Sequence, residues 1–246
     1  MKEFATSNTQ IKISLKYNLR QLKEITSRNF NHFCQRTTNY QKSQLRQDLF
    51  VLFVTNFKQN GYFIEAGASD GITSSNTFTL EKNFNWNGIL IEPGTYWKES
   101  LNKNRTCHIG YKAIWRENES ILFNEVQNKP TLSHISSVDP NSWMFDINQE
   151  TKSQCTVQGI TLLDLLDHYN APNVIDYLSL DTEGSEYDIL SVFDFNKYDI
   201  EIITVEHNYS SNREKIFNLL QDKYTHVLTD VSGKEDWYIR NYSLAF

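Results

Sequence analysis

The chain has 246 residues, of which 39% are hydrophobic, and it carries a formal net charge of −6. This composition supplies enough apolar side chains for a core, which excludes global disorder, and the length fits one large α/β domain or a domain with a short extension. The negative charge disfavours nucleic acid as a partner, because proteins that bind it usually present a basic face.

The three cysteines, Cys34, Cys107 and Cys155, are odd in number and far apart. This spacing indicates neither a zinc knuckle nor a disulfide framework. No apolar run approaches the roughly 18 residues that a membrane span needs, and residues 1–10 are too polar for a secretory signal. We therefore expect a protein of a reducing compartment, the cytoplasm, without a membrane span.

The first part of the chain is more polar than the rest. Its apolar residues recur partly with helical spacing, which predicts an amphipathic helix over about 15–30, followed by a polar linker to about 42. We therefore divide the chain into a helical extension with its linker, residues 1–42, and a larger domain, residues 43–246.

Beyond the linker, helical and strand-like patterns alternate. We expect helices over 45–57, 75–84, 97–104, 161–169, 185–193 and 213–224. We expect strands over 62–67, 88–93, 108–115, 120–126, 174–181, 200–208, 225–231 and 236–241. Residues 127–155 are polar and irregular, which suggests an insertion or lid.

The alternation predicts βαβ units, and hence an α/β fold with a mostly parallel sheet and helices on both faces. The last two strands have no helix between them, so they are expected to form a hairpin and to add one antiparallel strand. Because ligands of such sheets bind at the carboxyl ends of the strands, the candidate site residues are sought there.

The first strand ends in the segment GYFIEAGASDG, where small residues are flanked by Glu65 and Asp70. Gly67 lacks a Cβ atom, so a ligand can approach the backbone closely. The glycines do not match the dinucleotide fingerprint GxGxxG, so a pyrophosphate cradle is a poor fit. Glu92 ends the next strand and can accept hydrogen bonds from ribose hydroxyls. These residues predict a nucleoside site without a pyrophosphate.

Two later strands end in a second group of polar residues. Asp181 closes one strand, with Glu183 just beyond it, and Glu206, His207 and Asn208 close the other. If these strands are neighbours, the two ends face one cleft. His207 could then act as a general base. Alternatively, Asp181, Glu206 and Asn208 offer oxygen ligands for Mg²⁺. Both readings stay open.

These segments resemble the FkbM-type methyltransferases, which use S-adenosylmethionine. The resemblance is carried by GYFIEAGASDGITSSNTFTLEKNFNWNGILIEP (61–93), IDYLSLDTEGSEYDIL (175–190), ITVEHN (203–208) and, upstream, SQLRQDLFVL (43–52). It extends over about residues 43–241 and is weak around 115–155. Ser69 stands where methyltransferases generally carry the middle glycine of the first loop.

The resemblance implies a Rossmann-like class I methyltransferase fold with a seven-stranded sheet, and S-adenosylmethionine as the cofactor. The residues expected around this cofactor are Glu65, Gly67, Asp70, Asn76, Glu92, Ala113 and Asp181. Glu92 would bind the ribose, and Ala113 would lie near the adenine. His207 and Asp181 are the catalytic candidates.

The implied reaction is O-methylation of a hydroxyl on a sugar, glycan or related small polar acceptor, with Mg²⁺ as an open requirement. One alternative is a nucleotide-dependent oxidoreductase, which the broken glycine pattern disfavours. Another is a non-catalytic binding module, which the retained acids at the strand ends disfavour. Acceptor specificity is expected in residues 127–155, where His134 could project into the acceptor site.

Overall fold

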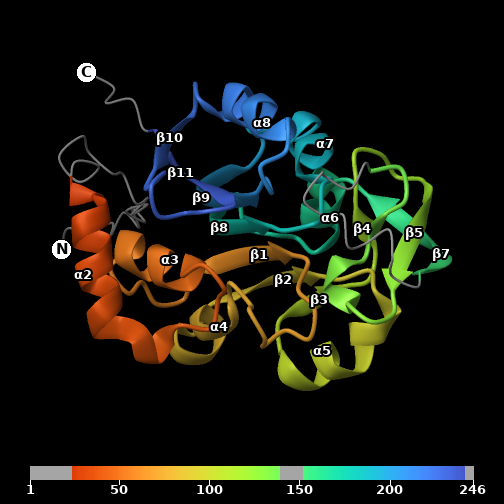
Figure 1. The fold of residues 1–246 in the computed structure, drawn as a ribbon, viewed down its shortest axis with the longest axis horizontal. Helices are drawn as coiled ribbons and strands as arrows, with labels where there is room; N and C mark the ends of the chain where they lie inside the picture. The colour runs from red at the N-terminus through yellow and green to blue at the C-terminus, as the bar shows by residue number, and fades with distance from the viewer. Residues whose placement is uncertain (1–23, 139–151, 242–246) are drawn as a thin grey trace, which may run out of the picture.

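A seven-stranded sheet forms the centre of the molecule (Figure 1), in the computed structural model that describes residues 24–138 and 152–241. Its strands are β1 (Tyr62–Ala66), β2 (Asn87–Ile91), β3 (His108–Gly110), β8 (Val174–Leu180), β9 (Asp199–Glu206), β10 (Tyr224–Val227) and β11 (Glu235–Arg240). Their spatial order is β10-β11-β9-β8-β1-β2-β3. Neighbours from β3 to β9 pair in parallel, whereas β11 is antiparallel to both β9 and β10. The predicted Rossmann-like sheet and its antiparallel strand are confirmed.

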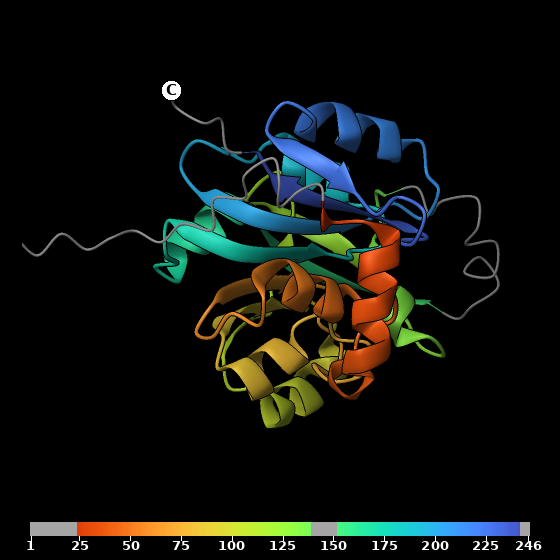
Figure 2. The same cartoon turned by 90° about the vertical axis from the view of Figure 1, so that its left-hand side faces the viewer.

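Helices cover both faces of this sheet (Figures 1 and 2). One face carries α2 (Ser27–Thr37), α3 (Gln47–Thr55), α4 (Phe78–Phe84) and α5 (Lys98–Asn104). The other carries α6 (Leu162–His168), α7 (Glu186–Ser191) and α8 (Asn212–Leu220). Short 3-10 turns are η1 (Thr38–Tyr40), η2 (Thr95–Trp97) and η3 (Pro130–Leu132).

The central strands have a hydrophobic core on each side. In β1, Phe63 packs into the core beneath α3, and its neighbour Ile64 packs into the core beneath α6 to α8. Tyr177 and Leu178 divide in the same way in β8. Successive side chains of a strand point to opposite faces, so a strand covered on both sides must be apolar throughout. This explains why these segments read as continuous apolar runs.

The polar linker expected before residue 42 is wrong, because most of that stretch is helix α2. Phe30, on this helix, is fully buried and lies 5.6 Å from Trp237, measured between ring centroids. A contact with the far end of the chain therefore fixes this helix, which local composition could not reveal. Most of the helix expected over 15–30 lies outside the described residues.

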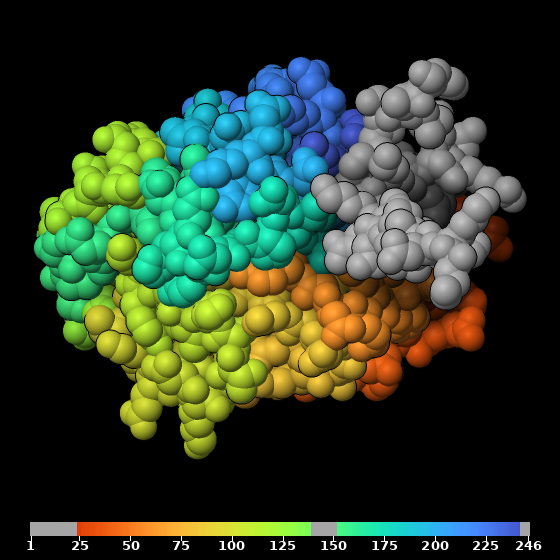
Figure 3. Space-filling view, turned by 180° about the vertical axis from the view of Figure 1, so that it is seen from behind, coloured from red at the N-terminus to blue at the C-terminus, as the bar shows by residue number. Residues whose placement is uncertain are grey.

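A second, smaller sheet was not expected. It contains β4 (Ala113–Ile114), β5 (Ser120–Val126), β6 (His134–Ile135) and β7 (Lys152–Ile160), in the order β4-β7-β5-β6. The prediction that residues 127–155 are irregular is thus wrong for the last residues of this range, which belong to β7 and pair antiparallel with β5. The single strand expected over 108–115 is divided between the two sheets. In the view from behind (Figure 3), the green segments of the second sheet lie beside α6 at one end of the molecule.

No helix within residues 24–138 and 152–241 is long and apolar enough to cross a membrane. The three cysteines are free thiols, and Cys34 is buried among the aromatic side chains around α2 and α3.

Candidate active site

A cavity of about 440 Å³ lies at the carboxyl ends of β2, β1 and β8. Its size suits a small-molecule ligand. All the residues predicted to surround a cofactor line it, namely Glu65, Gly67, Asp70, Asn76, Glu92, Ala113 and Asp181. They come from separate strand ends, so the sheet order brings them together. The ends of β2 and β8 are two strand spacings apart, about 10 Å.

The loop after β1 is held in an unusual backbone conformation. Gly67 has φ +85°, and a Cβ atom there would lie 1.9 Å from the carbonyl oxygen of Asp181. Glycine is therefore required by the neighbouring strand end, rather than by a ligand as the sequence suggested. Ser69 also has a left-handed φ, +47°, which L-residues with a side chain adopt at a cost. A glycine would adopt this conformation at less cost than serine.

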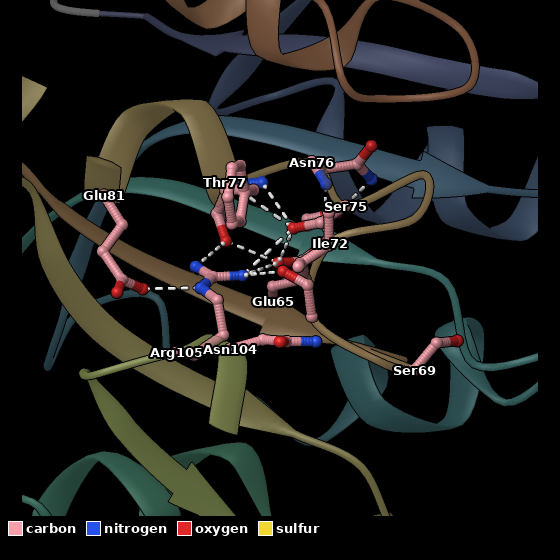
Figure 4. A network of polar contacts seen from close by, with 12 residues as sticks. Glu65, Ser69, Ile72, Ser75, Asn76, Thr77, Glu81, Asn104 and Arg105 are labelled. Carbon is pink, nitrogen blue, oxygen red and sulfur yellow. Dashed lines mark hydrogen bonds and ion pairs between the residues drawn. The ribbon is translucent and has the colours of Figure 1, made fainter. Parts of the chain in front are cut away.

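The carboxylate of Glu65 is hydrogen-bonded by neighbouring residues of the protein (Figure 4). Its buried carboxylate accepts hydrogen bonds from Ser75 Oγ at 2.9 Å, from the backbone N–H of Asn76 at 2.7 Å and from Thr77 Oγ1 at 2.5 Å. These bonds fix the segment that leads into α4. Glu65 thus shapes the wall of the cavity, and its oxygens are already engaged.

Arg105 completes this network and was missed in the sequence. Its side chain is fully buried, with Nη1 3.6 Å from Glu65 Oε2 and Nε 2.6 Å from Glu81 Oε2. It also donates to the carbonyl oxygen of Gly71 at 3.0 Å and to Thr77 Oγ1 at 2.9 Å. A guanidinium has five donors in a rigid fork, which suits it to tie a loop to two acids. No motif surrounds Arg105, so only the fold shows its role.

The carboxylate of Asp70 stabilises the turn that follows the loop after β1. Its Oδ1 accepts hydrogen bonds from the backbone N–H groups of Ile72 at 2.8 Å and Thr73 at 2.7 Å. Its Oδ2 accepts one from Thr73 Oγ1 at 2.7 Å. This is the usual way in which aspartate stabilises a turn. Asp70 lines the cavity, with its carboxylate engaged by its own segment.

Asn76 presents an unsatisfied polar atom. Its Nδ2 donates to Ser179 Oγ at 2.8 Å, and the residue is 5% exposed. Among the described residues, Oδ1 of Asn76 has no hydrogen-bond partner. Because an unpaired buried acceptor is costly, a donor group of a ligand is the natural partner for it.

Glu92 stands at the end of β2, buried beside the first loop. Its Oε2 accepts from the backbone N–H of Ser69 at 2.9 Å, and its Oε1 accepts from that of Gly94 at 2.8 Å. Burial raises the pKa of Glu92 to about 7, with a smaller contribution from Glu125, although the two N–H donors oppose the rise. Each carboxylate oxygen keeps a lone pair for a further donor, such as a ribose hydroxyl.

Three carboxylates meet at the ends of β8 and β9. Asp181, Glu183 and Glu206 each place an oxygen within 4.8 Å of the others. Burial raises the pKa values of Asp181 and Glu183, and the neighbouring carboxylates raise them further. Lys234 Nζ lies 2.6 Å from Glu206 Oε1. Burial alone would lower the pKa of Lys234, but Glu206 and the other carboxylates outweigh it and raise the pKa.

His207 does not line the cavity, although the sequence suggested it as the general base. Its imidazole is buried, with Nδ1 accepting the backbone N–H of Tyr209 at 2.9 Å and Nε2 lying 3.5 Å from Asp236 Oδ1. Asn208 is also absent from the cavity wall, and its Nδ2 donates to Glu206 Oε2 at 2.5 Å. His207 thus lies outside the wall of this cavity, and its role as a general base stays a prediction.

The second sheet forms the wall opposite the first loop. Phe123, Ile135 and the η3 segment line the cavity there, whereas nothing marked them in the sequence. His134 does not reach it: the ring is buried, with Nδ1 2.9 Å from the carbonyl oxygen of Leu132. The idea that His134 projects into the acceptor site is wrong. Residues 139–151 of the expected insertion lie outside the described residues.

A family model described as "Methyltransferase FkbM domain" matches residues 65–230. The chain belongs to the FkbM methyltransferase family. As a member of this family it is a methyltransferase, with S-adenosylmethionine as the methyl donor, and the oxidoreductase alternative is set aside. No curated protein matches the chain.

Two solved structures are similar to this FkbM methyltransferase in outline. One is a precorrin-6y C5,15-methyltransferase from Geobacter metallireducens GS-15, at 11% identity and a TM-score of 0.38, covering 78% of this chain and 85% of that chain. The other is a fibrillarin/Nop5p complex, at 10% identity and a TM-score of 0.36, covering 75% of this chain and 73% of that chain.

Proposed function

We propose that this methyltransferase transfers the methyl group of S-adenosylmethionine to a hydroxyl oxygen of a sugar, glycan or related small polar acceptor. The observation that carries the proposal is the pair of carboxylates, Asp181 and Glu183, that lines the same cavity as Glu92 and Asn76. One end of the cavity suits a nucleoside, and the other offers proton acceptors.

The cofactor would lie across the strand ends. Glu92 would accept hydrogen bonds from the ribose hydroxyls, and Asn76 Oδ1 would accept one from the cofactor's ammonium group. Ala113 and Ile114 would contact the adenine, because both are small or apolar and line the cavity beyond Glu92. Gly67 and Asp70 would form the floor beneath the amino-acid end. The cavity size and the unpartnered Oδ1 of Asn76, assessed among the described residues, support this arrangement.

Methyl transfer to a hydroxyl requires the protein to position the two reactants and to accept one proton. When bound, S-adenosylmethionine would supply an electrophilic methyl group, and the acceptor oxygen would displace the neutral thioether S-adenosylhomocysteine from it. Holding oxygen and methyl in line supplies much of the rate. The hydroxyl proton passes to the carboxylate pair of Asp181 and Glu183, whose raised pKa values make the ionised form a stronger base.

The polar lining near the carboxylates favours a polar acceptor. Hydroxyl-bearing side chains contribute to the wall, namely Thr73, Ser74, Ser75, Thr131, Thr182 and Ser185. A sugar presents several hydroxyl groups, which such a surface can bind with donors and acceptors alike.

The test is an assay of S-adenosylhomocysteine formation with a panel of free sugars, sugar nucleotides and oligosaccharides. With a hydroxyl acceptor, Glu183→Gln should lower kcat by roughly 10²–10⁴-fold, the usual contribution of a general base, while cofactor affinity stays within a few-fold. Tight binding of S-adenosylhomocysteine without turnover on any hydroxyl acceptor would instead favour the binding-module alternative.

A further inference from the structure

The carboxylate cluster of Asp181, Glu183 and Glu206 needs a positive charge. Its oxygens lie within 4.8 Å of one another, where like charges repel strongly in a partly dry site. The sequence suggested Mg²⁺, held by Asp181, Glu206 and Asn208. In the structure, the cation beside this cluster is the ammonium group of Lys234.

Both oxygens of Glu206 already have a partner in the protein, Oε1 in an ion pair and Oε2 in a hydrogen bond. Lys234 Nζ lies 2.6 Å from Oε1, and Asn208 Nδ2 lies 2.5 Å from Oε2. The Asn208 amide thus turns its nitrogen, which cannot ligate a metal, toward the cluster. A divalent cation needs oxygen ligands at 2.0–2.6 Å. At Glu206 it would have to compete with the Lys234 ammonium, which lies against the same carboxylate.

The position of Lys234 is fixed by the sheet. Its backbone carbonyl accepts hydrogen bonds from the N–H groups of both His207 at 3.0 Å and Asn208 at 3.1 Å. The next residue, Glu235, pairs with Glu206 in the ladder between β11 and β9. The stem of Lys234 lines the cavity and its side chain is 27% exposed. The ammonium therefore reaches the cluster from the turn residue just before β11, whose backbone is hydrogen-bonded to the segment that follows β9.

We infer that the Lys234 ammonium takes the place of a divalent cation at the Asp181, Glu183 and Glu206 cluster, so that the protein itself supplies the positive charge at this site and no metal is needed. The inference deepens the proposed function, on which it rests only for the view that this cluster faces the acceptor. The donor set does not fit the predicted Mg²⁺, and Lys234 is a positioning residue that holds Glu206 in place.

The experiment is a titration of the full chain with Mn²⁺, followed by electron paramagnetic resonance, in the presence of S-adenosylhomocysteine. Wild type is compared with Lys234→Met, which keeps the length of the side chain and removes its charge. Lys197→Met is the matched control, since Lys197 pairs with Asp167 on the surface and does not line the cavity. The readout is metal binding, so it is independent of any acceptor or turnover.

Wild type and Lys197→Met should leave Mn²⁺ free. Lys234→Met should bind about one equivalent, roughly tenfold or more tightly than wild type, because a repelling unit charge has been removed. Adding Asp181→Asn to Lys234→Met should abolish that binding. Lys234→Arg, which keeps the charge, should behave as wild type.

One equivalent of Mn²⁺ bound by wild type, and lost on Asp181→Asn, would overturn the inference. So would a folded Lys234→Met, able to bind S-adenosylhomocysteine, that takes up no Mn²⁺. If Lys234→Met does not fold, the titrations of wild type and of Asp181→Asn still test the inference, because they show whether wild type binds Mn²⁺ at the cluster. Failure of the proposed function would appear separately, as absence of methyl transfer with the metal titration unchanged.

Discussion

Ser69 donates its backbone N–H to Oε2 of Glu92 across 2.9 Å, and this bond joins the loop after β1 to the end of β2. The loop can make it because Ser69 adopts a left-handed φ of +47°. Glu92 is thereby oriented by backbone groups on both of its oxygens, since Gly94 N–H binds the other. A carboxylate held in this way is ready to receive a ribose without rearrangement.

Glu92→Gln should weaken S-adenosylhomocysteine binding by roughly 10- to 100-fold, because hydrogen bonds to a charged acceptor become bonds to a neutral one. Isothermal titration calorimetry measures the change. Glu125→Gln is the control, because Glu125 lies nearby and does not line the cavity. An unchanged Kd in Glu92→Gln would remove Glu92 from the ribose site.

The affinity for S-adenosylhomocysteine should depend on pH through Glu92, whose pKa is about 7. Only the ionised carboxylate can accept from both ribose hydroxyls, so binding favours loss of the proton. The affinity should therefore be constant above about pH 8 and should fall by up to about tenfold per unit below pH 7. Calorimetry from pH 5.5 to 8.5 tests this. The Glu92→Gln variant should give a flatter curve, and equal slopes in both proteins would contradict the assignment.

Substitutions at two positions of the first loop should change stability by very different amounts. Ser69→Gly relieves left-handed strain of about 1 kcal/mol, but the unfolded chain gains entropy, so stability should change by less than about 1 kcal/mol. Gly67→Ala places a Cβ atom 1.9 Å from a backbone oxygen and should cost roughly 3 kcal/mol or more. Urea denaturation measures both. Similar losses in the two variants would show that the loop conformation is not the cause.

Arg105→Met should lower the free energy of unfolding by roughly 3–5 kcal/mol, because it removes the buried cation beside Glu65 and leaves Glu81 with only Lys82. The side chain of Arg105 is fully buried. Arg116→Met is the control, since Arg116 is 48% exposed and its ion pairs are long, and it should change stability by less than about 1 kcal/mol. Denaturant unfolding of the two variants makes the comparison, and equal small effects would contradict the role of Arg105.

His207→Gln should reduce stability by about 1–2 kcal/mol, through lost hydrogen bonds, and should leave the pH profile of kcat unchanged. The reason is that His207 contacts Asp236 and Tyr209 and does not line the cavity. The measurement is methyl transfer against pH for both proteins. Loss of a titration step near neutrality, together with a fall in kcat of a hundredfold or more, would restore His207 as the base.

Much of the sheet architecture, and several of the residues that line the cavity, could be predicted from the sequence. Apolar runs that end in acids mark parallel strands and their carboxyl ends, and these ends must meet at one edge of the sheet. For this reason Glu65, Glu92 and Asp181 were found together in one cavity. The second sheet escaped prediction because β7 begins with three polar residues and is held by pairing with β5, which depends on distant partners.

The sequence by itself determined the main sheet and the acids at its strand ends that line the cavity, because these follow from side-chain periodicity along each strand. Only the tertiary structure decided what each carboxylate does. Glu65 is bound by Arg105, Glu206 is bound by Lys234, and His207 turns toward Asp236. Each of these contacts joins residues far apart in the chain, so the direction of a side chain beyond its strand end depends on partners that no local pattern contains.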